Sequence, residues 1–208
     1  MRKRWFVASV CVFFGVCVAG LLIVYFYCSP SSSRARSEQY AVYSAYIDAG
    51  LTGESHSLGS TRGVTVILNE TATFNPSIPN RVAMLQGALF SFTGMERFKT
   101  DTSFATRYNF LVSNLSSEPL GRDFAISGRY VFASRDDIAN WFSPETNRRF
   151  EGNYGYLMFS RVGFNRSLSE AVFYMEHMCG LCGGGRFVLM RKGAGRWVVI
   201  REEWTWIS

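Results

Sequence analysis

An apolar run near the N-terminus constrains this chain more than any other feature. Twenty-three residues from Trp5 to Tyr27 carry no charged side chain, and Arg2–Arg4 stand directly before them. A helix rises about 1.5 Å per residue, so a helix of this length reaches roughly 35 Å, enough to cross a hydrocarbon core of about 30 Å. The sequence therefore predicts a transmembrane helix over residues 5–27, within an anchor over residues 1–28.

A cleaved signal peptide and a lipid-modified cysteine are the alternative interpretations of this segment. The apolar region of a signal peptide usually spans about 7–15 residues and precedes a small-x-small cleavage site. This run is longer and ends in Tyr25–Cys28, where the residues before the cysteine are large. The same large residues argue against a bacterial lipobox at Cys28, so an uncleaved anchor is favoured.

The charges on either side of the span predict its orientation. Three basic residues and the terminal amine precede it, whereas Arg34 and Arg36 follow it with Glu38 close behind. The positive-inside rule therefore favours a cytoplasmic N-terminus, which leaves the main domain extracytoplasmic and the protein a single-pass membrane protein.

Composition divides the remainder into a tether and one domain. Residues 29–37 are mostly Ser, Pro, Arg and Ala, a composition typical of a flexible tether. Residues 38–208 show no repeat or low-complexity tract and read as a single domain. Since 16% of the chain is aromatic and only 18% is charged, a disordered chain is excluded.

The net charge of +6 gives little support to nucleic-acid binding. Three of the 22 basic residues precede the apolar run, and all 16 acidic residues follow it, which leaves +3 for the rest of the chain. The remaining basic residues are scattered, with Arg148–Arg149 the densest case, and they form no stripe. We therefore expect no nucleic-acid partner.

Periodicity predicts helices and one strand in the first part of the domain. The expected elements are a helix from Ser37 to about Asp48 that ends at Gly50, a strand over Val64–Leu68, and a helix over 101–114 whose core stripe is Phe104, Tyr108, Leu111 and Leu115. Ser134 and Asp137 have the spacing of a capping box. A third helix carrying Ile138, Trp141 and Phe142 is therefore expected to begin there and to stop at Pro144.

The last third changes to the pattern of a β-meander. Apolar and aromatic runs cover Tyr154–Phe164, Ala171–Met178, Arg186–Lys192 and Arg196–Trp206, and Lys192–Gly195 has the composition of a hairpin turn. Alternation puts Phe187 and Leu189 on one face and Val188 and Met190 on the other, as in a strand covered on both sides. The sequence thus predicts an α+β fold with helices packed on a curved antiparallel sheet, similar in shape to cystatin or NTF2-like domains.

Several segments resemble an uncharacterised family of bacterial exported and envelope proteins. The segments are Ser160–Asn165, Cys179–Gly185, Gly195–Val199 and the ending Trp204–Ser208, with looser similarity at Tyr40–Ala45 and Asn69–Thr71. The likeness is tightest over residues 155–208. It implies an envelope location and a shared domain, and it implies no activity because the family has none established.

Cys179 and Cys182 form the motif with the most specific chemistry. In an oxidising compartment the pair can close a small disulfide ring across a turn between two strands. The alternative is a thiol–disulfide oxidoreductase, which needs a cysteine of lowered pKa, commonly in front of a helix. Here Gly183–Gly185 and a predicted strand follow the motif. A structural disulfide is therefore favoured.

Other patterns were weighed as sites. His177 with the two cysteines supplies three soft ligands, but a structural zinc site needs a fourth, and His56 lies far away in the sequence. The glycines at 183–185 precede a strand, so a turn with positive φ is expected rather than a phosphate loop. The acidic pairs Asp136/Asp137 and Glu202/Glu203 gain no role from sequence alone. We therefore expect no metal and no cofactor.

Two classes of function agree with these observations. The favoured one is a membrane-anchored protein whose outward domain is a non-catalytic binding or structural module for an unknown protein or small-molecule partner. The alternative is an envelope thiol–disulfide oxidoreductase or small-ligand enzyme that uses Cys179 and Cys182.

Overall fold

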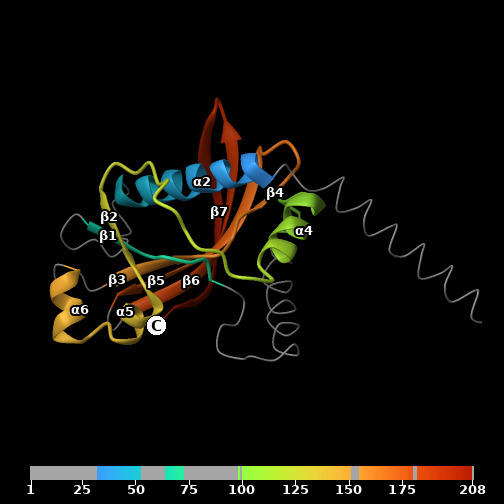
Figure 1. The fold of residues 1–208 in the computed structure, drawn as a ribbon. Coiled ribbons are helices and arrows are strands. Elements are labelled where there is room, and N and C mark those ends of the chain that lie inside the picture. Colours follow the sequence, from blue (N-terminus) through green and yellow to red (C-terminus); the bar gives the residue numbers. More distant parts are fainter. Residues whose placement is uncertain are drawn as a thin grey trace, which may run out of the picture.

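The computed structural model describes residues 32–52, 64–72, 98, 100–150, 155–179 and 182–207. The elements, shown in Figure 1, are α2 (Ser32–Thr52), β1 (Val64–Leu68), α4 (Phe104–Ser113), β2 (Arg129–Ala133), α5 (Arg135–Ala139), α6 (Pro144–Arg149), β3 (Gly155–Phe159), β4 (Gly163–Phe164), β5 (Glu170–Cys179), β6 (Cys182–Gly193) and β7 (Arg196–Ile207). The fold is α+β, as the sequence predicts.

One seven-stranded sheet organises the domain. Its strands follow the order β2-β1-β3-β5-β6-β7, and β4 pairs with β5. The antiparallel meander β5-β6-β7 is confirmed, and its last hairpin turns at Ala194 and Gly195, both with positive φ. The expectation of a wholly antiparallel sheet was wrong, because β1 runs parallel to both β2 and β3.

Helix α2 is longer than the sequence indicated. It begins at Ser32, within the segment interpreted as tether, and it continues through Gly50 to Thr52. Figure 1 shows it lying across the sheet. Its expected core residues Tyr40, Tyr43 and Ile47 are buried, in the same cluster as apolar residues of β1, β3, β5 and β6.

The predicted membrane span, Trp5–Tyr27, lies outside the described residues. Within the described ranges, no helix has both the length and the apolar character needed to cross a bilayer.

Both faces of the meander are covered, as alternation predicts. Val188 and Met190 belong to the cluster beneath α2, whereas Phe187 and Leu189 pack with Phe98, Phe110 and Val172 on the opposite face. Helix α4 contributes Phe110 to that second cluster. Strand β6 is therefore a central strand in the packing as well as in the sheet.

Helix α4 forms where expected, but its core stripe was predicted correctly only at Leu111, which packs against the second cluster. Phe104 and Leu115 from the expected core stripe are 62% and 50% exposed. The buried residues are instead Thr106, Asn109 and Phe110. Polar side chains occupy this interior face because they find partners: Thr106 donates to Glu170 at 2.7 Å, and Asn109 donates to the Phe164 carbonyl at 2.7 Å.

The region after β2 contains two short helices where one was expected. Ser134 and Asp137 form the predicted capping box at the start of α5. This helix ends at Ala139, and Pro144 opens α6 instead of stopping a helix. Proline is well tolerated in the first turn of a helix, where its missing N–H has no intrahelical acceptor.

Gly163 allows α4 to pack closely against the sheet. A Cβ added to Gly163, in β4, would lie 2.5 Å from Phe110 Cα, so α4 packs directly on the glycine backbone. Main-chain atoms cannot move aside as the end of a flexible side chain can. The position therefore excludes any larger residue.

We expect Gly163→Ala to lower the free energy of unfolding by about 1–3 kcal/mol, the usual cost of overpacking a core. Gly193→Ala is the matched control, because a Cβ there meets nothing within 4 Å. Urea denaturation of both variants measures the difference. Equal stability of the two variants would contradict the close packing of α4 on β4.

Candidate functional site

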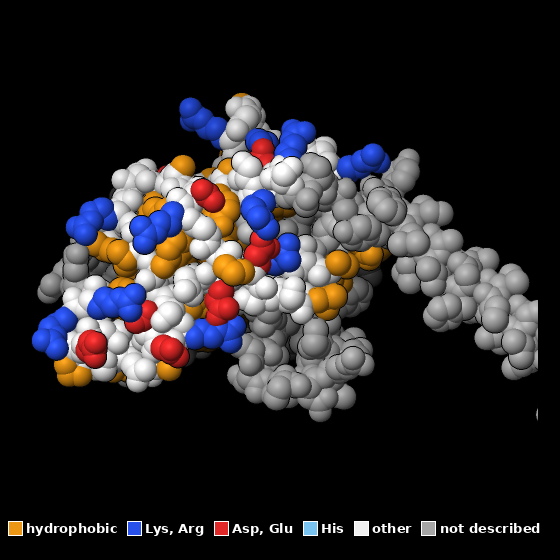
Figure 2. Space-filling view, viewed as in Figure 1, with side chains coloured by type: hydrophobic (Ala, Val, Ile, Leu, Met, Phe, Trp, Pro, Cys, Tyr) orange, Lys and Arg blue, Asp and Glu red, His pale blue; other side chains and the backbone are white. Residues whose placement is uncertain are grey.

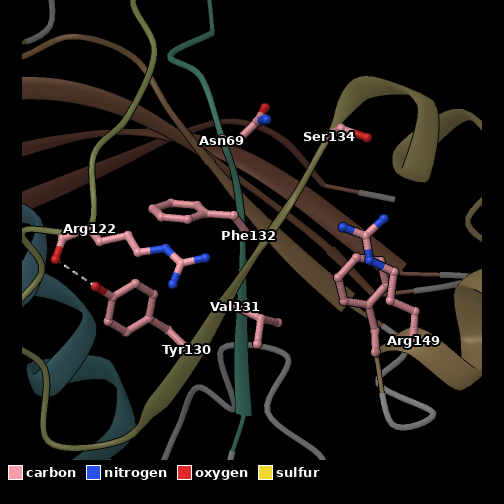
Figure 3. Close-up of a pocket in the computed structure, with 8 residues that line it drawn as sticks. Asn69, Arg122, Tyr130, Val131, Phe132, Ser134 and Arg149 are labelled. Carbon is pink, nitrogen blue, oxygen red and sulfur yellow. Dashed lines mark hydrogen bonds between the residues drawn. The ribbon is translucent and has the colours of Figure 1, made fainter.

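A cavity of about 490 Å³ lies beside β2. Figure 3 shows its lining side chains, which come from the end of β1, from the segment before β2, from β2 itself and from α6. They are Asn69, Arg122, Tyr130, Val131, Phe132, Ser134, Arg149 and Phe150. The lining thus combines aromatic walls with two guanidinium groups.

The cavity follows the open edge of the sheet. Tyr130, Val131 and Phe132 are consecutive, so their side chains point to alternate faces of β2, and yet all three line the cavity. Tyr130 and Phe132 pack against the cluster beneath α2, whereas Val131 packs with Trp141 and Phe150 on the other side. A cavity that touches both faces reaches the strand edge, and β2 is the terminal strand among those that the structure describes.

The main chain of β2 has hydrogen-bonding groups on this edge. The Ala133 carbonyl accepts from Asn69 N at 2.8 Å and therefore points toward β1. Along a strand, the N–H and C=O of one residue share a side, and successive residues alternate. The N–H and C=O groups of Tyr130 and Phe132 consequently point away from β1, toward the side of β2 on which no described strand pairs.

Arg122 is held at the cavity by the segment that crosses α2. Gly121 N donates to the Tyr40 hydroxyl at 2.6 Å, and Ala125 N donates to the Ser44 hydroxyl at 2.9 Å. The Tyr130 hydroxyl donates to the Arg122 carbonyl at 3.0 Å (Figure 3). Among the described residues, no carboxylate pairs with the Arg122 guanidinium, so its charge is available to a ligand.

Arg149 stands on the opposite side of β2 and is already neutralised. Its guanidinium pairs with the Asp137 carboxylate and lies 5.3 Å from the Phe150 ring centre. Burial acts to raise the pKa of Asp137, but hydrogen bonds from Ser134 and the charge of Arg149 outweigh it and hold that pKa below its ordinary value. Asp137 is therefore ionised at neutral pH, and Arg122 is the stronger anion site of the two.

The surrounding surface has the same character. Figure 2 shows hydrophobic side chains gathered over the β2 end of the molecule, with basic and acidic side chains around them. Arg135, at the start of α5, pairs with Glu70. The area therefore presents an apolar contact surface bordered by charges of both signs.

The candidate disulfide residues occupy paired backbone positions. Cys179 ends β5, Cys182 begins β6, and the two are register partners. Directly opposed residues of antiparallel strands have Cα atoms about 4.5–5.5 Å apart, within the range of about 4.4–6.8 Å that disulfides span. The backbone thus suits a disulfide, and a strand rather than a helix follows Cys182, as the sequence indicated.

His177 lies two residues before Cys179 and is half-buried. Its Nε2 is buried without a hydrogen-bond partner, and burial together with the charge of Arg186 lowers the pKa of the imidazole. No group of three potential metal ligands occurs among the residues that the structure describes, and His56 lies outside them. The described residues therefore complete no metal site around His177.

The glycines before the last hairpin support tryptophans instead of forming a turn. Gly183–Gly185 lie inside β6, and positive φ occurs among the described glycines at Gly195 alone, so the expected turn was wrong. A Cβ on Gly184 would lie 2.5 Å from the Trp204 ring, and one on Gly185 would strike Trp206. The glycines are needed because an indole covers the strand at this point.

The acidic pairs have structural partners. Asp137 caps α5 and pairs with Arg149, as described above. Glu202 accepts from the Tyr46 hydroxyl at 2.7 Å and pairs with the buried Arg186 at 3.4 Å. Both carboxylates are engaged in holding neighbouring elements together.

Sequence reasoning missed the cavity. It identified neither β2 nor Arg122, because Arg129–Ala133 lacks the run of β-branched residues that marks Val64–Leu68, and an isolated arginine belongs to no pattern. Comparisons with known proteins add no information here: no family model, no curated protein and no solved structure matches this chain.

We expect Cys179 and Cys182 to be joined in the isolated protein. Alkylation without reductant, followed by peptide mass mapping, should leave both cysteines unmodified, and prior reduction should expose both. A ring this small stabilises by only about 2 kcal/mol in the chain-entropy model, so the reduced protein should remain folded. Labelling of both cysteines without reductant would contradict the disulfide.

Proposed function

We propose that this protein is a membrane-anchored, non-catalytic binding module that takes up an extended peptide segment along the edge of β2. The single observation that carries the proposal is the cavity beside that strand, where the Arg122 guanidinium, which has no carboxylate partner among the described residues, lies near a strand edge that no described strand covers. A peptide that adds a strand gains affinity from main-chain hydrogen bonds and specificity from side-chain pockets.

The chemistry of the lining suggests which peptide fits. The outward N–H and C=O groups of Tyr130 and Phe132 would pair with a main chain laid alongside β2. An acidic side chain of that peptide would meet Arg122, whose planar guanidinium suits a carboxylate. Apolar side chains would rest on the rings of Tyr130, Phe132 and Phe150. The proposed ligand is therefore an extended, partly apolar peptide segment with a carboxylate.

The location is part of the same proposal. The uncharged run Trp5–Tyr27 supports a transmembrane helix with a cytoplasmic N-terminus and an outward domain. The resemblance over residues 155–208 to exported envelope proteins supports the same compartment, as does the opposed cysteine pair. The similarity in shape to cystatin or NTF2-like domains, with a curved sheet under a helix, stays a prediction.

We expect a peptide probe to bind and Arg122→Gln to weaken it. The probe is a fluorescent pool of decapeptides rich in Val, Ile and Thr with one Glu, titrated by anisotropy against the full chain in nanodiscs. Loss of a charged hydrogen bond costs about 1.5–3 kcal/mol, so the variant should bind roughly tenfold or more weakly. Arg148→Gln is the matched control, since Arg148 is an exposed neighbour that bonds its own helix at Pro144.

Two altered pools separate the parts of this interaction. The affinity of a pool with Gln in place of Glu should no longer depend on Arg122. A pool N-methylated at alternate residues should not bind, because methylation removes the main-chain N–H donors. Binding that survives N-methylation would show recognition of a carboxylate compound without strand pairing. Failure of the unmodified pool to bind would overturn the peptide proposal.

We expect the full chain to remain with membranes after extraction at alkaline pH, because burial of an apolar helix of this length is strongly favourable. Protease added outside intact cells or spheroplasts should degrade residues 38–208 while protecting the N-terminus. Release at alkaline pH, or protection of the domain, would contradict the anchor or its orientation. A chain that lacks residues 2–31 is the control for non-specific association.

A further inference from the structure

We propose that the exposed apolar face of α4 rests on the bilayer in which the N-terminal segment is anchored. This face, the α4 stripe, consists of Phe104, Tyr108, Val112 and Leu115. The proposal rests on the membrane anchor proposed above. It assigns a second surface of the domain to a lipid partner, separate from the cavity at β2.

The α4 stripe is a continuous surface on one side of the helix. Phe104, Tyr108 and Val112 follow at intervals of four residues, which places them on one face of the helix, and Leu115 comes directly after the C-cap Asn114. Phe104, Val112 and Leu115 are 62%, 36% and 50% exposed, and the rings of Phe104 and Tyr108 stack with centres 6.0 Å apart. The opposite face is fixed to the sheet through Asn109 and Phe110, so the stripe cannot turn inward.

Helix α4 lies next to the first turns of α2. The side chains of Asn114, the C-cap of α4, and the main chain of Arg161 exchange two hydrogen bonds of 2.7 and 2.9 Å. The next residue, Val162, donates to Gln39 of α2 at 3.1 Å. Arg36 of α2 and Arg161 both pair with Glu118. Figure 1 shows the same arrangement, with α4 beside the N-terminal end of α2.

The chain length before α2 argues for the bilayer as the occupant. The apolar run ends at Tyr27, and α2 begins at Ser32. Even a fully extended chain covers only about 3.5 Å per residue, so α2 begins within roughly 17 Å of the end of the span. The domain is thus held against the membrane by the end at which the α4 stripe is exposed.

The charges at this end agree with a lipid surface. Arg34 is exposed on the first turn of α2, and Arg107 lies on α4 with no carboxylate partner among the described residues, whereas the exposed Arg36 pairs with Glu118. Figure 2 shows hydrophobic side chains over α4 at the same end of the molecule. Apolar side chains bordered by basic ones are typical of surfaces that lie in the headgroup region.

Photolabelling from the lipid phase tests the proposal. The full chain is reconstituted in phosphatidylcholine vesicles that contain a phospholipid with a diazirine near the start of one acyl chain, then irradiated, digested and mapped by mass spectrometry. We expect adducts on peptides covering Phe104–Leu115 at least about tenfold above those covering α5 and α6, because burying one large apolar side chain shifts an equilibrium by about that factor.

The matched variants are Phe104→Ser with Leu115→Ser, and Phe142→Ser as control. Phe142 is 74% exposed and lies between α5 and α6, remote from α4 in Figure 1. The double variant should reduce α4 adducts about tenfold, and the control should leave them unchanged. Circular dichroism of each variant verifies folding.

The outcomes separate this proposal from the anchor. Adducts on both Trp5–Tyr27 and α4 support it. Adducts on the N-terminal run with none on α4 would overturn the docking and leave the anchor intact, and absence from both would overturn the anchor as well. Cross-linking of α4 to residues 73–97 or to a second copy of the chain, in place of lipid, would assign the stripe to that occupant and overturn the proposal.

Discussion

The seating of α2 on the sheet through Tyr43 is the contact on which the other features of the domain depend. This side chain is fully buried, stacks on Phe159 with ring centres 4.7 Å apart, and donates from its hydroxyl to the Ser160 carbonyl at 2.6 Å. Burial raises the pKa of the phenol well above its ordinary value, so it stays a neutral donor. Tyr40, one turn earlier, orders the segment that carries Arg122 through Gly121.

The same helix therefore organises two distant surfaces. Its middle turns set the wall of the cavity at the β2 edge, through Tyr40 and Ser44. Its earlier residues Gln39 and Arg36 bind Val162 and Glu118, in segments that lie beside α4. A change that tilts α2 would therefore move both surfaces together.

Local signals predicted the elements whose partners are near in sequence. Val64–Leu68, the capping box at Ser134 and the turn at Lys192–Gly195 all follow from short-range patterns that need no tertiary contact. The pairing of β1 with both β2 and β3 was not predicted, because parallel neighbours are joined by long connections that leave no register signal. The buried face of α4 was predicted only in part for a related reason. Asn109 lies on that face, and the Phe164 carbonyl that accepts its hydrogen bond is 55 residues away in the sequence.

The candidate site was harder to predict than the fold. Cys179 and Cys182 are visible in sequence as a motif, and the hairpin does place them opposite each other. The cavity instead depends on which strand is terminal, a property of the whole sheet, and on Arg122, which gains meaning only when its neighbours fold over α2. Neither the terminal position of β2 nor the placement of Arg122 can be predicted from a short segment of the sequence.

The run Gly183–Gly185 affects how the last strand, β7, pairs with β6. Trp204 and Trp206 extend from the same strand and cover β6 where that strand has no side chains. A one-residue shift in the register of β7 would move each indole to the opposite face of the sheet. The side chains that neighbour each indole in β7 would then lie against the main chain of Gly183–Gly185. The three glycines therefore specify the register in which β7 pairs with β6.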